Sequence, residues 1–515
     1  MALINLEGGG SPVNIAVRIG ATLAVLALLY NLVQLVRVRY TFWRWKKQGV
    51  PMMPYSLLFG HLPVLMKLRS SVPKDIHANY IPQLIYENWR TLFPDRKTFP
   101  PVIYTDSWPF GPPALWIIDP EAGWAANADM NLKRARSTQD FFEPLTENLD
   151  LVSMEGDVWK TWRTRLNPAF SQRNVNTLVP GMIRDVEIFA DRLRQRAGAG
   201  GAWGKVFQLE KITTDLSIDV IARSTLGMEL REQTDGPGKF RTAMMDQLKR
   251  CMSRFSLVDM ITWHDPRRTL DIARQRAVMF AELYPAVMGC LQRKDEGGTK
   301  TILDQAASLC TTMPPSKLFI QTVMAQLKLF MFAGHDTTAT TLCWVLHNMA
   351  KNPEIARKVR AELDEVIGDP ADMSKKLTES PHLLSSLTYI TALIKETLRF
   401  YAPAASAREG SVEHKFLDRE TGVLCPSDGL FLIDSVRALL RDEEVWPRAG
   451  EVIPERWLTT DPNDPLYPKK QVFRAFGNGP RVCIGQELAM TELRLAVAYV
   501  AREFDIDCAY DEWDA

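Results

Sequence analysis

One cysteine of this chain stands in a setting suited to ligand chemistry. Cys483 ends the run Phe476-Gly477-Asn478-Gly479-Pro480-Arg481-Val482-Cys483, and Ile484-Gly485 then lead into an apolar helical pattern. Gly477 and Gly479 can adopt positive φ and let the backbone lie against a flat group. The dipole and the free amide groups at the N-terminus of that helix favour a thiolate over a thiol. The run therefore predicts a thiolate ligand beside a flat cofactor, with Arg481 placed to meet a negative group on it.

The remaining cysteines suggest no competing chemistry. The total of seven is odd and no close pairs occur, which argues against a disulfide framework and favours a reducing compartment. Patterns of the CxxC or HExxH type are absent from the sequence, so a zinc site has no basis. The alternative interpretation of Cys483 is that it is a small buried hydrophobe, as free cysteines often are.

The ten residues 476–485 resemble the haem-binding signature of the cytochrome P450 monooxygenases. The resemblance implies a mainly α fold with small β-sheets, the cofactor haem b (iron protoporphyrin IX), and Cys483 as the ligand of its iron. Phe476 and Gly485 would flank the same cofactor. The resemblance also predicts further motifs upstream, and four are found.

The first motif is Ala333-Gly334-His335-Asp336-Thr337-Thr338. It lies in an apolar run from about residue 316 to 349, which predicts one long buried helix. The resemblance implies that Gly334 permits a local bulge and that Asp336 and Thr337 relay protons to oxygen. Alternatively, the threonine hydroxyls only bond to the preceding helical turn.

The second and third motifs contain charged residues with an expected structural role. They are Glu396-Thr397-Leu398-Arg399 and Pro454-Glu455-Arg456-Trp457. An isolated Glu and Arg three apart on a helix would be a solvated pair worth only ~0.2–0.5 kcal/mol. The resemblance implies instead that Glu396, Arg399 and Arg456 form a buried ion network that holds the loop of Cys483.

The fourth motif places an aromatic residue and a cation on one helix face. Trp159 and Arg163 are one turn apart, and Arg408 ends the run Pro403-Ala404-Ala405-Ser406-Ala407-Arg408. The resemblance implies that these residues and Arg481 contact the haem propionates, since buried carboxylates need cations. For any one arginine alone, solvation at the surface is the simpler interpretation.

The expected substrate pocket has four residues beside the cofactor. The resemblance places Phe332 and Ala333 above the haem and Ala404 and Ala405 beside it. The run 403–408 is similar to that of filamentous-fungal members that tailor secondary metabolites. The small alanines suit a bulky substrate, or they simply pack.

The chain as a whole predicts one large catalytic domain. Its 515 residues contain no repeat and no long flexible linker, and a net charge of +1 does not favour nucleic acid. Helical patterns dominate, and strand patterns are few, chiefly at 102–104 and 115–118. We expect the P450 domain over 66–515, behind a basic and proline-rich connector at 37–65.

The N-terminal region predicts a membrane anchor. Residues from about 13 to 36 are mostly apolar and could cross a bilayer core of ~30 Å as one helix. The basic residues after this stretch favour a cytosolic position for all that follows: Arg37, Arg39, Arg44, Lys46 and Lys47. We expect a luminal tip and single-pass anchor at 1–36 in the endoplasmic reticulum membrane. A cleaved signal peptide is the alternative.

The resemblance implies a monooxygenase that inserts one oxygen atom from O2 into a hydrophobic small molecule. Its electrons would come from NADPH through NADPH-cytochrome P450 reductase, with cytochrome b5 as a further candidate donor, and membrane lipid would be in contact with the anchor. A tailoring step in fungal polyketide or terpenoid biosynthesis is the expected role. The alternatives are a fatty-acid or xenobiotic hydroxylase, a haem-thiolate isomerase, dehydratase or peroxygenase, and a haem carrier or sensor.

Overall fold

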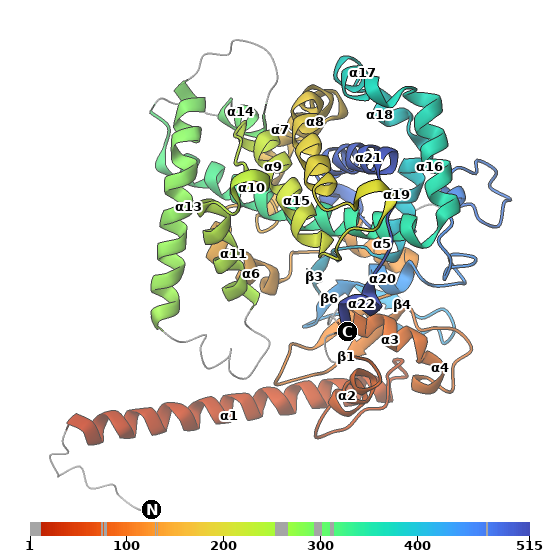
Figure 1. Ribbon diagram of the computed structural model, residues 1–515. Helices are drawn as coiled ribbons and strands as arrows, with labels where there is room; N and C mark the ends of the chain where they lie inside the picture. The colour runs from red at the N-terminus through yellow and green to blue at the C-terminus, as the bar shows by residue number, and fades with distance from the viewer. Residues whose placement is uncertain are drawn as a thin grey trace, which may run out of the picture. The chain divides into compact units, whose positions relative to one another are not determined.

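The computed structural model describes residues 12–73, 76, 80–128, 130, 132–252, 266–292, 301–308, 314–469 and 472–514. The chain divides into two compact units. The first comprises Met1–Ile117 and Gly410–Leu432, and the second comprises Ile118–Glu409 and Ile433–Ala515. Helices predominate in the described residues and the strands are short (Figure 1), as the sequence predicts.

The first unit combines a long N-terminal helix with short helices and strands. Its elements are α1 Pro12–Lys47, α2 Leu62–Ser70, α3 Ile81–Glu87, α4 Trp89–Leu92, β1 Val102–Thr105, β2 Ala114–Ile117, β4 Lys415–Leu417 and β5 Leu424–Pro426. Strand β6, Phe431–Asp434, begins in this unit and ends in the second.

This unit contains two antiparallel strand pairs, β1 with β2 and β4 with β5. In the first pair, Val102 of β1 lies opposite Ile117 of β2, and Thr105 lies opposite Ala114. In the second pair, Phe416 of β4 lies opposite Cys425 of β5. Nearly all residues of β1 and β2 are buried, which explains why their sequences are continuously apolar instead of alternating.

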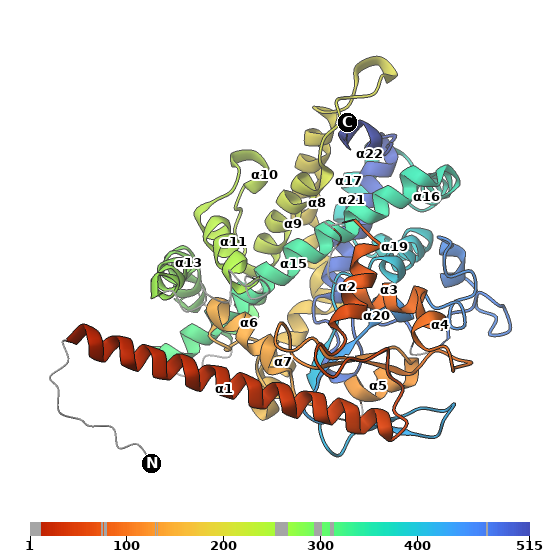
Figure 2. The same ribbon diagram turned by 90° about the horizontal axis from the view of Figure 1, so that it is seen from below.

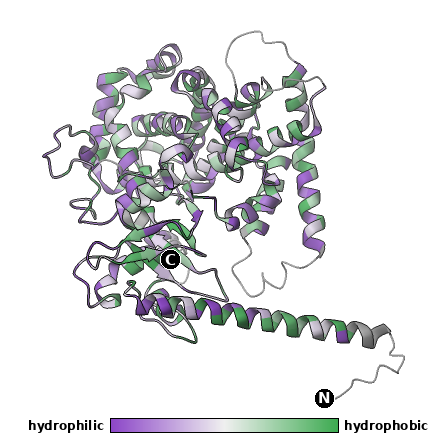
Figure 3. Cartoon of the chain, turned by 180° about the vertical axis from the view of Figure 1, so that it is seen from behind, coloured by the Kyte–Doolittle hydropathy of each residue, from purple (hydrophilic) through white to green (hydrophobic). Residues whose placement is uncertain are grey.

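Helix α1 is long and apolar enough to cross a membrane. The candidate span is Val17–Lys47, and hydrophobic residues predominate along the helix (Figure 3). The helix continues beyond the apolar stretch that the sequence analysis placed at about 13–36, and it ends at Lys47. Phe42 and Trp45 in this extension are buried, so its last turns belong to the packed part of the unit.

Arg39, one of the basic residues that follow the apolar stretch, is part of the packed first unit. It is buried and forms an ion pair with Asp106, and its guanidinium also donates to the carbonyl of Trp108 at 2.9 Å. Tyr55 donates to the same aspartate at 2.9 Å. Arg39 therefore stabilises the first unit and is not exposed to lipid headgroups, because a buried cation requires a partner.

The second unit contains most of the helices. Its elements are α5 Pro120–Ala128, α6 Arg136–Thr146, α7 Gly156–Leu166, α8 Gln172–Arg194, α9 Leu209–Leu226, α10 Glu232–Asp235, α11 Lys239–Met252, α13 Pro266–Gln292, α14 Ile302–Ala307, α15 Lys317–Lys351, α16 Pro353–Val366, α17 Met373–Glu379, α18 Leu383–Ser386, α19 Thr388–Phe400, β3 Ala407–Glu409, α20 Val436–Leu439, α21 Gln486–Glu503 and α22 Tyr510–Asp514. Short 3₁₀ turns connect them: Asn167–Phe170, Ala199–Gly201, Pro370–Asp372, Pro454–Trp457 and Gly479–Arg481.

Helix α15 passes through the middle of this unit (Figures 1 and 2). Its start is marked by Ser316, whose side chain accepts a hydrogen bond from the Phe319 amide, and it ends before Pro353. Both faces of the helix are apolar because it packs against α9, α19 and α21. This agrees with the long buried helix that the sequence predicts.

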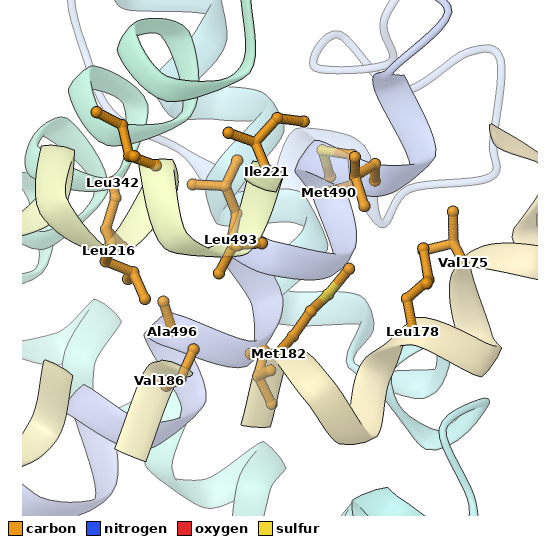
Figure 4. Close-up of a cluster of buried hydrophobic side chains, with 14 of the residues drawn as sticks. Val175, Leu178, Met182, Val186, Leu216, Ile221, Leu342, Met490, Leu493 and Ala496 are labelled. Carbon is orange, nitrogen blue, oxygen red and sulfur yellow. The ribbon is translucent and has the colours of Figure 1, made fainter. Parts of the chain in front are cut away.

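The core of the second unit lies where α8, α9, α15 and α21 meet. Figure 4 shows side chains from all four helices in contact, among them Met182, Leu216, Leu342 and Leu493. These residues are almost completely buried. The core thus holds α15 and α21 in fixed positions, and both helices line the cavity described next.

Candidate functional site

A cavity of about 310 Å³ lies inside the second unit. Helices α7, α9, α15 and α21 contribute to its wall, together with the segments 403–408 and 474–485. Most of the residues predicted for the site line it: Trp159, Arg163, Ala333, Thr337, Ala404, Ala405, Arg408, Phe476, Arg481, Cys483 and Gly485. The fold therefore brings together residues that are more than 300 positions apart in the sequence.

Cys483 faces this cavity from a tight loop. Its amide donates to the carbonyl of Phe476 at 2.9 Å, and Gly477 and Gly479 have φ of +75° and +66°. A Cβ at Gly479 would lie 2.8 Å from the Cα of Ala128, so α5 packs too closely for any side chain there. Protein surrounds Cys483, yet its side chain is accessible, because it is exposed to the cavity.

The surroundings of Cys483 act on its pKa in opposite directions. Burial raises the pKa of the thiol, while a hydrogen bond from the Gly485 amide and the charge of Arg163 lower it. The net direction is upward. The loss of water around a buried anion outweighs these partners.

Five arginines line the cavity, two more than the sequence indicated. Arg134 and Arg474 join Arg163, Arg408 and Arg481, and Arg474 is already paired with Asp434 at 2.7 Å. The Nε atoms of Arg134 and Arg408 are buried and have no hydrogen-bond partner among the described residues. Burial and the neighbouring arginines lower the pKa of Arg134 to about 9, and burial lowers the pKa of Arg163 and Arg408.

Arg481 is bound to the segment that precedes α7. Its guanidinium donates to the carbonyls of Leu151 and Met154, at 3.2 and 2.9 Å, and to the carboxylate of Glu155 at 2.9 Å. Burial lowers its pKa to about 10 despite Glu155. The cysteine loop and the start of α7 are thereby joined at the edge of the cavity.

Helix α15 presents small and hydroxyl side chains to the cavity. Ala333, Gly334, Thr337, Thr338 and Thr341 all line it. The Thr337 hydroxyl donates to the Ala333 carbonyl at 2.8 Å, which is the local contact that the alternative interpretation described. Two predicted residues of α15, Asp336 and Phe332, are not among the lining residues.

Asp336 and Phe332 lie outside the cavity lining. Asp336 is exposed. The Phe332 ring packs against the rings of Phe141 and Phe142, with centroids 6.3 and 5.6 Å away. Phe332 therefore packs against α6 and does not line the cavity in the described structure.

The expected bulge at Gly334 is not seen, since α15 is one continuous α-helix. Gly334 instead allows close packing against α9. An added Cβ would lie 2.7 Å from Cγ1 of Ile221. The absence of a side chain is required by the approach of the two helices.

The three charged residues predicted as a network do lie together. Glu396 accepts from Arg399 at 2.8 Å and from Arg456 at 3.1 Å, and all three are fully buried. The amide of Ile453 and the indole of Trp457 also donate to Glu396. The carboxylate is thus surrounded by donors, which a buried charge requires.

Two candidate functional residues, Arg134 and Glu492, were not predicted from the sequence. Arg134 belongs to the basic run Lys133-Arg134-Ala135-Arg136, which was the only local signal for it. Glu492 lines the cavity from α21 and accepts from the Ser217 hydroxyl at 2.7 Å, and burial raises its pKa to about 8. Its signal was a carboxylate within an apolar helical stripe.

Comparison with known proteins identifies the family. The model of the family "Cytochrome P450" matches residues 125–513. This chain belongs to the cytochrome P450 family. A relative from Polytolypa hystricis, "Cytochrome P450 monooxygenase polC", is 35% identical over 96% of this chain and 88% of its own length. The protein is accordingly a cytochrome P450 monooxygenase.

Other P450s agree in sequence or in fold. "Cytochrome P450 monooxygenase acrF" of Aspergillus aculeatus is 28% identical, over 87% of this chain and 91% of its own. The crystal structure of the P450 CYP102L1 superposes with a TM-score of 0.68 at 19% identity, covering 84% of this chain and 93% of that chain. The latter similarity supports the fold alone.

The residues that line the cavity fit haem, which members of the P450 family bind through a cysteine thiolate. Cys483 is accessible from the cavity, and two buried arginine Nε atoms lack partners there. Haem carries two carboxylates that could meet such cations. The donor set and the cofactor are therefore complementary in charge.

Proposed function

We propose that this P450 holds haem b through Cys483 and inserts one oxygen atom from O2 into a hydrophobic small molecule. The observation that best supports this proposal is that Cys483 faces an internal cavity lined by five arginines. When bound, haem supplies the O2 chemistry, and a thiolate ligand favours cleavage of the O–O bond. The roles assigned below concern the residues of the chain.

The propionates would be held by arginines from three segments. We assign Arg163 of α7, Arg408 of β3 and Arg481 of the cysteine loop to them, with Arg134 as an added partner. Arg481 is already paired with Glu155, whereas Arg134 and Arg408 each have a buried Nε atom without a hydrogen-bond partner among the described residues. Trp159 would orient Arg481, whose guanidinium carbon lies 3.9 Å from the ring centre.

The proton path would use α15. The Thr337 hydroxyl lines the cavity and can donate its proton there by rotating away from the Ala333 carbonyl. Asp336 is exposed on the same helix and could take up a proton from water. Together they would carry protons from solvent to the cavity, Asp336 first and Thr337 second.

The remaining wall suits an apolar substrate. Ala404 and Ala405 leave space beside the cavity, and Leu329 and Phe330 add apolar surface. We propose a tailoring step in fungal polyketide or terpenoid biosynthesis. This is supported by the fungal sources of two related monooxygenases and by the run at 403–408.

Electrons would come from NADPH through NADPH-cytochrome P450 reductase, with cytochrome b5 as a second donor. Residues 1–36 would form the luminal tip and membrane anchor, 37–65 the connector and 66–515 the catalytic domain. The apolar helix α1 supports a single-pass position in the endoplasmic reticulum membrane, with the catalytic domain in the cytosol.

A metabolite comparison tests the substrate class. Extracts of the native host with and without the gene are compared by accurate-mass chromatography. We expect the deletion strain to lose a product and to accumulate a precursor that lacks one oxygen atom. Microsomes containing this P450 and the reductase should then convert the precursor only with NADPH. An unchanged metabolite profile, or conversion without NADPH, would contradict the proposal.

A further inference from the structure

A second cavity, of about 200 Å³, lies elsewhere in the second unit. It is formed by Glu147 after α6, by part of α13 that includes Arg276 and Phe280, and by part of α15 that includes Met324 and Lys328. None of its lining residues lines the central cavity, which is the cavity of about 310 Å³ that Cys483 faces. The two cavities are therefore separate sites in the described structure.

Lys328 is the unusual residue of this cavity. Only 7% of the residue is exposed. Among the described residues, its ammonium has no hydrogen-bond or ion-pair partner. Burial lowers its pKa to about 8, with Arg276 acting in the same direction and Glu147 and Asp150 opposing it. A buried ammonium without a partner is costly, so the cavity lacks a complementary anion.

The other charged groups that line this cavity do not supply an anion for Lys328. Arg276 donates to the carbonyl of Pro144 at 2.7 Å and to the carboxylate of Glu143 at 3.0 Å. Glu147 lies 4.0 Å from Arg276, and 42% of its side chain is exposed. Two cations and one carboxylate line the cavity, which gives a net charge of +1.

Apart from the amide of Gln321, the rest of the wall is apolar. Phe280, Leu283 and Met324 provide aromatic, branched and flexible surface around Lys328. The volume is below the ~300–1,000 Å³ of pockets for drug-sized ligands, so a ligand must be short. One negative charge joined to a short apolar body matches both the charge and the size.

We propose that the second cavity binds a small carboxylate with a short apolar tail, whose carboxylate accepts a hydrogen bond from Nζ of Lys328. The site is independent of the substrate and reaction proposed above. Its ligand would replace water around Lys328 and place its tail against Phe280 and Met324. A charge-assisted hydrogen bond in a buried setting is among the stronger polar contacts in proteins.

Octanoate is a suitable probe. The full-length holoenzyme in detergent is first saturated with miconazole, which blocks the central cavity, and octanoate is then titrated by calorimetry. We expect one site, which binds octanoate more tightly than the neutral octanol. Lys328→Met should weaken octanoate binding by about tenfold or more, the loss of one charge-assisted bond. Lys317→Met makes the same change at an exposed position of α15 and should have no effect.

If Lys328→Met does not fold, a labelling experiment tests the proposal instead. Trinitrobenzenesulfonate reacts with neutral amines, and mass spectrometry locates the modified lysines. Octanoate should protect Lys328 of the unaltered enzyme and leave Lys317 reactive. The proposal is overturned if octanoate does not bind the miconazole-saturated enzyme, if octanol binds equally well, if folded Lys328→Met retains full affinity, or if Lys328 is not protected.

Discussion

The guanidinium carbon of Arg481 lies 3.9 Å from the centre of the Trp159 ring. One residue belongs to the cysteine loop and the other to α7, and both line the central cavity. A contact of this kind contributes about 0.5–2 kcal/mol. It joins the loop of Cys483 to the helix that also carries Arg163.

Trp159→Leu should therefore reduce haem retention. The leucine removes the aromatic face that orients Arg481, and we expect a lower ratio of haem to protein after purification. Trp162→Leu is the matched control, because Trp162 is on the same helix but packs against Phe319 and does not line the cavity. Equal haem loss in both variants would show that only the fold of α7 matters.

Cys483→Ser should abolish the red-shifted Soret band of the reduced carbon monoxide complex. Serine is a poor substitute for a thiolate ligand, so the spectrum should lose the feature that sulfur ligation produces. Cys508→Ser, which changes a partly exposed cysteine outside the cavity, should keep the band. A normal band in Cys483→Ser would refute the ligand assignment.

Thr337→Ala should separate oxygen consumption from product formation. Without the hydroxyl, proton delivery in the cavity is impaired, and we expect several-fold more hydrogen peroxide per NADPH consumed. Thr337→Ser should largely restore coupling. Thr322→Ala removes an equivalent hydroxyl on α15, which donates to the Leu318 carbonyl at 2.8 Å, but Thr322 does not line the cavity. Coupled turnover in Thr337→Ala would count against the relay.

Glu396→Gln should destabilise the protein severely. Two fully buried arginines, Arg399 and Arg456, would lose their shared carboxylate. Breaking a buried ion pair costs about 3–5 kcal/mol. We expect a lower apparent Tm and loss of haem. The control Glu354→Gln breaks the exposed contact with Arg357 and should leave the apparent Tm unchanged. Similar Tm values for the two variants would contradict a structural role of the network.

Glu492→Gln should change how stability depends on pH. Burial raises the pKa of Glu492 from its ordinary 4.5 to about 8, so the folded state holds a proton that the unfolded state releases between these values. Stability therefore falls as pH rises from 4.5 towards 8, by an amount of the order of 3 kcal/mol at pH 7. Glutamine cannot ionise, and it can still accept a hydrogen bond from Ser217.

The apparent Tm of Glu492→Gln relative to the unaltered protein should thus increase between pH 5 and pH 7.5. Thermal unfolding at several pH values measures this difference. Glu487→Gln, at a partly exposed position of the same helix, provides the control. If both variants respond alike to pH, Glu492 is ionised in the folded protein and the assignment fails.

The sequence alone determined the features that depend on neighbouring residues. The cysteine loop lies within ten positions, so its glycines and the following helix could be read together, and the observed φ values at Gly477 and Gly479 agree. The start of α15 was marked by Ser316 after two prolines, and its length by an unbroken apolar run. Local backbone preferences and hydrophobic periodicity are properties of short segments.

Only the tertiary structure decided which distant residues share a site. Arg134 enters the central cavity because the segment before α6 passes beside β3, where Arg134 and Arg408 form an isolated bridge. Phe332 is turned towards Phe141 and Phe142, although its neighbour Ala333 lines the cavity. Lys328 is buried, and it shares a cavity with residues of α13 and with Glu147, which follows α6. The burial of a side chain and its ion-pair partners depend on packing between segments that are far apart in the chain. A local sequence pattern therefore does not predict them.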